Sequence, residues 1–269
     1  MFKYLSIVGF PTLLLSIVGA APLDLDPVSH LSEFGYLPPP DPNKPSSLIT
    51  DQALANAIRS YQEFMGLKVT GTLDSETSGQ MQQPRCGMVD LEQTPQNNPN
   101  SPNSFTLFGT RWSKKQLKYK ITKYPSNFSR EKTDSAIRRA FDVWSSVTPL
   151  TFVKKNSGPV HIEIRFERGH HNEICKPFDG PSHVLAHAYQ PSSNPIGGDA
   201  HFDDTENWTL DSSKGKDLFL VAAHELGHSL GLRHSKKKRA LMYPTYHGFG
   251  SHFELHPDDI KGIQTLYPR

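Results

Sequence analysis

The sequence predicts an α+β fold preceded by a small helical unit. Two observations support this prediction. Residues 48–84 have the spacing of helices with glycines as punctuation, whereas residues 105–268 combine alternating strand patterns with amphipathic helices. A linker rich in Asn, Pro and Ser at 92–104 separates the two parts. We therefore expect two domains after the first 20 residues, at 21–104 and 105–269.

The first 20 residues have the pattern of a secretory signal peptide. Lys3 precedes an apolar run at 5–18, and small residues follow at 19–21. A membrane anchor is the alternative, but the run is short for a span and Pro11 interrupts it. We therefore expect residues 1–20 to be removed and the rest to be secreted, without a transmembrane anchor.

The composition is that of an ordinary globular protein. The chain is 36% hydrophobic and 21% charged, so it can bury a core. Its net charge of +2 gives no argument for nucleic acid or a membrane surface as a partner. The two cysteines, Cys86 and Cys175, would by default form one disulfide in a secreted chain. Asn127 and Asn207 begin two glycosylation sequons.

The helical unit is predicted from two short patterns. Leu54, Ile58 and Tyr61 recur at the spacing of one helix face. Asp74 is a suitable N-cap for a further helix that runs to Met81.

The α+β part begins with a strand pattern at 117–122, followed by an amphipathic helix at 129–147 with a serine N-cap. Strand patterns return at 150–154 and 160–166, and a loop-rich region follows. A closing helix follows His256. The long helix is expected to bury Ala136, Ala140, Val143 and Val147.

The stretch VAAHELGHSLGLRHS contains three histidines at fixed spacings. His224 and His228, four residues apart, lie on one face of a helix. His234 can join them only if the chain leaves the helix, and Gly231 stands where that bend is needed. Three converging imidazoles with a fourth position open describe a catalytic zinc site. Glu225 lies on the neighbouring face, within reach of a water molecule at that site.

A core helix with incidental histidines is the alternative. At about one in twenty per fixed residue, the two helical histidines, the glutamate, the glycine and the third histidine would occur together by chance in on the order of one in ten thousand chains of this length. The zinc site is therefore the better interpretation.

Several motifs resemble those of the matrix metalloproteinases (matrixins, metzincin clan). HELGHSLGLRH matches the metzincin H-E-x-x-H-x-x-G-x-x-H pattern, ALMYP resembles its Met-turn, and Ser235 after the third histidine points to the matrixin branch. PRCGMVD resembles the cysteine-switch motif of that family. Because the chain stops at LYPR, its layout resembles the minimal matrilysins, which lack a hemopexin-like domain.

The resemblance implies a metzincin-like catalytic domain with a twisted, mostly parallel sheet and three helices, behind a helical propeptide. It implies a secreted zymogen of an endopeptidase that cleaves extracellular matrix or other extracellular proteins, with Glu225 as general base. It also implies that Met242 lies beneath the zinc, and that Pro244 and Tyr246 line the pocket for the residue after the cut.

Cys86 has a separate role in this resemblance. In the family, this cysteine occupies the fourth zinc position and keeps the enzyme latent, while Arg85 and Asp90 pair to hold the loop. Here Met88-Val89 replace the usual Val-Pro, which we expect to loosen the loop. Activating proteases would cut the linker at 92–104.

A second zinc is also implied by the resemblance. Its structural ligands would be His171, Glu173, His187 and His201. His170 competes with His171, because this loop is one residue longer than usual. Cys175 is a free thiol, an externally paired one, or a ligand in place of Glu173.

Calcium is implied by oxygen-bearing residues near PFDGP and in GGDAHFDDTENW. The expected ligands are the carboxylates or carbonyls of Asp179, Gly180, Ser182, Val184, Asp199, Asp203 and Glu206. A solvated acidic loop is the alternative.

The expected partners are extracellular protein substrates, activating proteases and tissue metalloproteinase inhibitors, and the expected state is a monomer. A non-catalytic secreted zinc-binding scaffold with the same fold is the alternative function, and the presence of Glu225 argues against it. The helical unit could also be a glycan-binding module, but Cys86 at its end favours the propeptide role.

Overall fold

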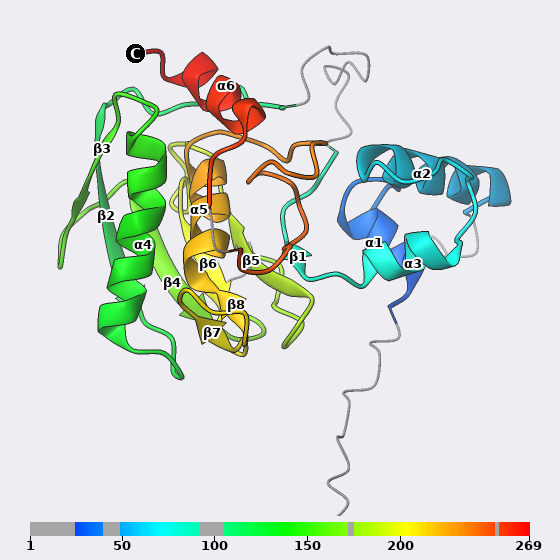
Figure 1. Ribbon diagram of the computed structural model, residues 1–269, viewed down its shortest axis with the longest axis horizontal. Helices are drawn as coiled ribbons and strands as arrows, with labels where there is room; N and C mark the ends of the chain where they lie inside the picture. The colour runs from blue at the N-terminus through cyan, green and yellow to red at the C-terminus, as the bar shows by residue number, and fades with distance from the viewer. Residues whose placement is uncertain (1–24, 40–48, 92–104, 172–174, 251–252) are drawn as a thin grey trace, which may run out of the picture.

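The computed structural model describes residues 25–39, 49–91, 105–171, 175–250 and 253–269. The predicted signal peptide therefore lies outside the described residues. In the described parts, no helix is both long enough and apolar enough to cross a membrane. The helical unit and the α+β unit lie side by side, with β1 running from the first towards the second (Figure 1).

Three helices form the N-terminal unit, and each begins at a residue whose side chain accepts a backbone hydrogen bond. Helices α1 (Pro27–Glu33), α2 (Asp51–Phe64) and α3 (Ser75–Met81) follow the caps Asp26, Thr50 and Asp74. The predicted cap and end of α3 are thus confirmed. The shared core includes Leu31, Phe34, Tyr61, Met65 and Met81.

The main sheet has six strands in the order β1-β5-β6-β4-β2-β3, and only the β5–β6 pair is antiparallel. The expectation of a mostly parallel sheet is confirmed. The strands are β1 (Arg85–Cys86), β2 (Gln116–Lys123), β3 (Thr151–Lys154), β4 (Ile162–Glu167), β5 (Val184–Ala188) and β6 (Ala200–Asp203). A second, two-stranded sheet pairs β7 (Trp208–Thr209) with β8 (Lys216–Asp217).

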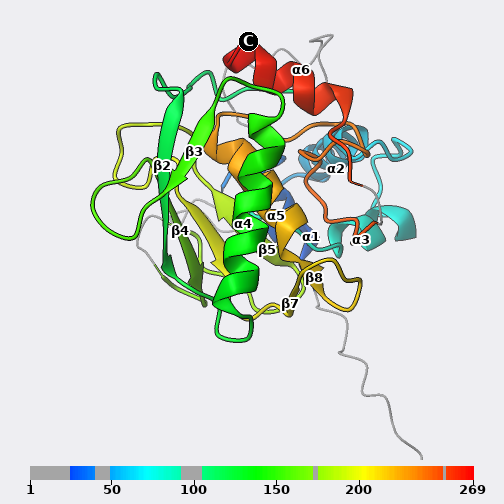
Figure 2. The same cartoon turned by 60° about the vertical axis from the view of Figure 1, so that its left-hand side comes forward.

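Three helices accompany this sheet: α4 (Arg130–Ser145), α5 (Leu218–Ser229) and α6 (Pro257–Leu266). Helices α4 and α5 lie side by side over one face of the sheet, while α6 crosses near one end of both (Figure 2). The edge strand β1 belongs to the segment that follows the N-terminal unit, so the two units share one sheet.

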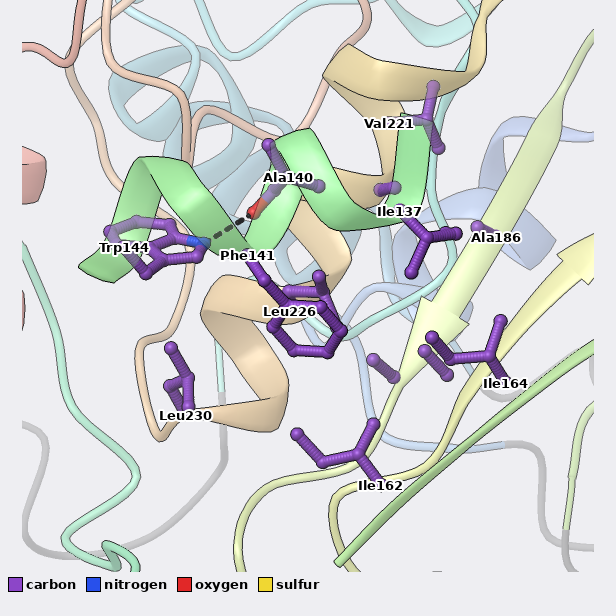
Figure 3. Close-up of a cluster of buried hydrophobic side chains, with 14 of the residues drawn as sticks. Ile137, Ala140, Phe141, Trp144, Ile162, Ile164, Ala186, Val221, Leu226 and Leu230 are labelled. Atoms are coloured by element: carbon purple, nitrogen blue, oxygen red, sulfur yellow. Dashed lines mark hydrogen bonds between the residues drawn. The ribbon is translucent and has the colours of Figure 1, made fainter. Parts of the chain in front are cut away.

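The core between α4, α5 and the sheet consists of buried apolar side chains. Figure 3 shows Phe141 and Trp144 of α4 near Leu226 of α5, with Ile162 and Ile164 of β4 among them. The indole N–H of Trp144 donates to the Ala223 carbonyl at 2.9 Å, so this polar atom is buried at little cost.

The apolar face predicted for α4 was partly wrong. Ala136 and Ala140 are buried, but Val143 and Val147 are only partly so. The adjoining face carries the larger side chains of Ile137, Phe141 and Trp144, and these are buried in place of the two valines. Larger side chains bury more apolar area, which favours this orientation of the helix.

Gly231 follows the C-terminus of α5 and has a backbone conformation that other residues rarely adopt. Its φ is +109°, and its N–H donates to the His228 carbonyl at 2.8 Å. A Cβ here would lie 2.4 Å from the Thr110 carbonyl oxygen. The bend therefore needs glycine for both backbone conformation and space.

We predict that Gly231→Ala lowers the free energy of unfolding by about 2 to 5 kcal/mol, since the left-handed conformation costs about 1–2 kcal/mol and overpacking adds about 1–3 kcal/mol. Gly248→Ala is the matched control, because Gly248 also has positive φ but its Cβ would meet nothing within 4 Å. Urea unfolding measures both. Equal losses in the two variants would show that the contact with Thr110 is unimportant.

Candidate metal centre and active site

Helix α5 and the bend after it bring three imidazoles together. His224 and His228 lie one turn apart on α5, and the chain after Gly231 returns His234 to them. Each ring has one nitrogen committed to a hydrogen bond. The three Nδ1 atoms lie 2.7, 2.8 and 2.7 Å from the Leu241 carbonyl, the Leu232 carbonyl and the Asp90 carboxylate.

These contacts determine the tautomers. Oxygen acceptors at Nδ1 place the proton there and leave a lone pair on each Nε2, as second-shell partners do at zinc sites. The Nε2 atoms of His224 and His234 are buried without a hydrogen-bond partner. Burial lowers the pKa of His224 to about 3 and that of His228 well below its usual value, so the rings stay neutral.

Cys86 completes the group. Its Sγ lies 3.4 Å from the His228 Nε2, and one donor atom from each of the four residues lies within 4.8 Å of all the others. Unpartnered imidazole nitrogens and a thiol are the donors that zinc accepts in a tetrahedral arrangement. The residues present therefore fit a zinc ion.

Glu225 is fully buried beside this group. Its Oε2 accepts a hydrogen bond from the Cys86 thiol at 3.6 Å, while Oε1 has no partner. Burial raises the pKa of Glu225 to about 8, and the hydrogen bond from Cys86 opposes that rise. Burial and the charge of Glu225 also raise the pKa of the Cys86 thiol. A carboxyl group in this position can accept or release a proton near neutral pH.

Strand β1 holds Cys86 in the site through backbone bonds. The Arg85 and Gly87 N–H groups donate to the His183 and Ala186 carbonyls at 2.7 and 2.8 Å. On the other side, the Cys86 N–H donates to the Pro244 carbonyl at 2.9 Å. The segment therefore lies between β5 and the chain after the Met-turn.

A buried ion pair fixes the loop around the thiol. Arg85 and Asp90 pair at 2.7 Å, with their side chains 1% and 0% exposed. The Arg85 guanidinium also lies 3.3 Å from the centre of the Phe34 ring, and the Tyr36 hydroxyl donates to Asp90 at 2.8 Å. Burial alone would raise the pKa of Asp90, but Arg85 and His234 hold it at about 2.

A cavity of about 420 Å³ adjoins the cluster. Its lining includes Cys86, His224, Glu225, Pro244 and Tyr246, so both residues expected in the substrate pocket face it. The Tyr246 hydroxyl accepts a hydrogen bond from the Asp217 N–H at 2.8 Å, which fixes the ring.

Met242 is buried below α5. A Cβ on Gly227 would come within 2.3 Å of the Met242 sulfur, so this glycine makes room for the methionine. The Asp259 carboxylate accepts hydrogen bonds from the Leu241 and Met242 N–H groups at 2.8 and 3.0 Å. Asp259 was not among the residues predicted from the sequence. The HPDD pattern indicates the start of the helix that carries Asp259, but it does not predict the contact of Asp259 with Met242, 17 residues earlier in the chain.

A second cluster brings together His171, Cys175, His187 and His201. One donor atom from each lies within 4.8 Å of the others. His170 is exposed and outside this group. Glu173, an expected ligand, lies outside the described residues.

The expected calcium residues fall in two places. Asp179, Asp203 and Glu206 lie close enough to interact: burial, and to a smaller extent the charge of Asp179, raises the pKa values of the Asp203 and Glu206 carboxyls. The Asp203 Oδ2 is buried without a partner. Gly180 and Ser182 both have positive φ, at +93° and +91°, in the turn beside them.

Two further expected ligands differ in their surroundings. The Val184 N–H donates to the Asp179 carboxylate at 3.2 Å, so Val184 adjoins the group formed by Asp179, Asp203 and Glu206. Asp199 lies apart from it and accepts a hydrogen bond from the Glu163 N–H at 2.8 Å. Burial raises the pKa of Asp199 to about 6.

Comparisons with known proteins agree with the architecture. The matrixin family profile matches residues 111–268, which is more than half of the chain. A putative peptidoglycan binding domain profile matches residues 29–81, the three-helix unit.

Three curated relatives illustrate the similarity. Stromelysin-1 of Mus musculus is 48% identical over 228 residues, covering 83% of this chain and 44% of that protein. Matrix metalloproteinase-19 of Homo sapiens is 41% identical over 244 residues, covering 91% and 46%. Interstitial collagenase of Oryctolagus cuniculus is 49% identical over 210 residues, covering 78% and 42%. The chain spans less than half the length of these relatives. With the family profile and the zinc-ligand geometry in agreement, the chain belongs to the matrixin family.

Proposed function

We propose that the chain is the latent form of a secreted zinc- and calcium-dependent endopeptidase that cleaves extracellular proteins. The observation that carries this proposal is the buried group of three imidazoles with Glu225 and the Cys86 thiol beside them. The proposed organisation is a signal peptide at 1–20, a propeptide at 21–104 and a catalytic domain at 105–269.

A zinc ion held by His224, His228 and His234 would supply Lewis-acid polarisation of a peptide carbonyl and of a water molecule. Glu225 would then accept the proton of the attacking water and deliver it to the departing amine. Because the nucleophile is water, no protein side chain has to form a covalent intermediate.

The way β1 lies against β5 supports an extended substrate. Its backbone bonds to the His183 and Ala186 carbonyls use the edge of the sheet. A substrate peptide could add to the same edge once β1 has left, which is β-strand addition. Pro244 and Tyr246 would then bound the pocket for the residue after the cut.

Latency is proposed to depend on Cys86, whose thiol would occupy the fourth coordination position of the zinc, the position that water or substrate would otherwise take. Release would require activating proteases to cut within 92–104 and the helical unit to leave. Tissue metalloproteinase inhibitors are expected to occupy the vacated cleft. The names of the relatives, stromelysin and collagenase, support extracellular protein substrates.

The catalytic proposal is tested with Glu225→Gln. After removal of the propeptide, we expect kcat/KM on a quenched fluorogenic peptide to fall by about 10²- to 10⁴-fold, the usual contribution of a general base. Zinc content should be unchanged. Exposed Glu131→Gln on α4 is the control and should keep full activity. If the zinc-loaded, processed parent chain is itself inactive, the enzyme proposal is wrong and the chain is better interpreted as a non-catalytic zinc-binding scaffold.

The latency proposal is tested with Cys86→Ser in the full chain. We expect peptide cleavage without any activator, at least about tenfold above the parent, because serine is a far weaker zinc ligand than thiolate. The parent should gain similar activity on adding an organomercurial. Gln83→Ser, at an exposed position of the same segment, should stay latent. A latent Cys86→Ser chain that retains its catalytic zinc would contradict the role of the thiol.

The calcium proposal is tested by thermal unfolding with calcium and with a calcium-selective chelator. At calcium a hundred times its dissociation constant, we expect a stabilisation of about 2.7 kcal/mol. Asp203→Asn should remove most of this difference, since its buried Oδ2 has no protein partner. Asp142→Asn, exposed on α4, should keep it. A Tm that does not respond to calcium would support the solvated-loop alternative.

A further inference from the structure

The second cluster is built on two neighbouring strands. His187 of β5 and His201 of β6 are direct partners in the antiparallel register, so their side chains lie on the same face of the sheet. The His187 Nε2 lies 3.2 Å from the His201 Nδ1.

His171 contributes a third imidazole with a free lone pair. Its ring is stacked between Phe178 and His187, with centroid distances of 4.9 and 5.3 Å and interplanar angles of 15° and 16°. The Nδ1 donates to the Gly169 carbonyl at 2.8 Å. That bond leaves the lone pair on Nε2, which is buried and has no hydrogen-bond partner.

Cys175 is the fourth member. Its side chain is buried, it forms no disulfide, and its Sγ lies 3.6 Å from the His201 Nδ1. The group contains no carboxylate from the described residues. Its sulfur lies within 4.8 Å of a ring nitrogen of each of the three histidines, and the thiol also forms a hydrogen bond with the Tyr189 side chain.

The distances match those of a tetrahedral site. With Zn–N bonds of about 2.05 Å and a Zn–S bond of about 2.3 Å, tetrahedral ligand atoms lie about 3.3 to 3.6 Å apart. Two of the separations in the structure, 3.2 Å between the His187 and His201 nitrogens and 3.6 Å between the His201 nitrogen and the Cys175 sulfur, agree with this geometry, and all four donor atoms lie within 4.8 Å of one another.

We infer that the second zinc site has three histidines and one cysteine as ligands, with the Cys175 thiolate, rather than Glu173, in the fourth position. On zinc binding the thiol would lose its proton to solvent, and the thiolate would give the site a single negative charge, as a carboxylate would. The two cysteines of the chain would then bind two different zinc ions: Cys86 reversibly in the latent form, and Cys175 permanently.

This assignment is tested by cobalt substitution in a host chain that carries Glu225→Gln and Cys86→Ser. The first change prevents self-cleavage, and the second leaves Cys175 as the one remaining cysteine. We expect two cobalt ions per chain and a near-ultraviolet thiolate-to-cobalt charge-transfer band. Cys175→Ser in this host should lose the band and bind its second metal more weakly by on the order of tenfold or more, since loss of an outer-shell partner alone costs 10–100-fold.

Cys175→Asp in the same host is the matched control, and it should hold two cobalt ions without the band. A host chain without the band overturns the inference, whether it binds one cobalt ion or two. With two ions and no band, the fourth ligand would be another group, such as Glu173.

A second measurement uses the unmodified latent chain, so it tests the ligands of zinc without any substitution. X-ray absorption at the zinc edge should give one sulfur per zinc at about 2.3 Å, averaged over both sites. Half a sulfur per zinc in the unmodified chain, together with no charge-transfer band in the host that lacks Cys86, would mean that Cys86 alone is a ligand and would overturn the inference. Neither measurement requires peptidase activity, so a failure here is distinct from a failure of the proposed function.

Discussion

The structure depends on holding three neutral imidazoles in a buried space where each can present one lone pair to the same point. Neutral rings are favoured because burial lowers their pKa values. Their orientation comes from oxygen acceptors at each Nδ1. Helix α5 supplies two of these rings, and Gly231 allows the third to return. The large apolar core between α4, α5 and the sheet gives α5 the rigidity that this convergence requires.

Asp90 links the N-terminal part of the chain to this centre. Its carboxylate accepts hydrogen bonds from Arg85, Tyr36 and the Nδ1 of His234. The same carboxylate therefore positions the loop that carries Cys86 and orients the third imidazole. Departure of the N-terminal part would remove the His234 partner, and a water molecule or another protein acceptor would have to replace it. Latent and processed forms thus differ in the surroundings of a ligand as well as in the fourth position.

The sequence predicted what local geometry determines. The candidate ligands His224 and His228 follow from helical spacing, and the need for Gly231 follows from the position of His234. Other features depend on contacts between distant segments. Asp90 reaches His234 across 144 residues, and Asp259 reaches the Met-turn from α6. The face of α4 was mispredicted because two adjoining stripes share helical spacing, and only the bulk of the opposing core selects between them. The choice of His171 over His170 depended on a loop whose length the motif did not fix.

Strand β1 shows how a short segment can be held in the site by its backbone. It completes the edge of the sheet through backbone bonds to the carbonyls of His183, just before β5, and of Ala186 within β5, and through a third bond to the Pro244 carbonyl, so its peptide groups lose little by leaving water. The buried Arg85–Asp90 pair then makes partial release costly, because separating the pair would leave a buried charge without its partner. Release is therefore expected to involve the segment as a whole. The cut that begins activation would accordingly have to fall outside β1 and its loop, in the linker that follows Leu91.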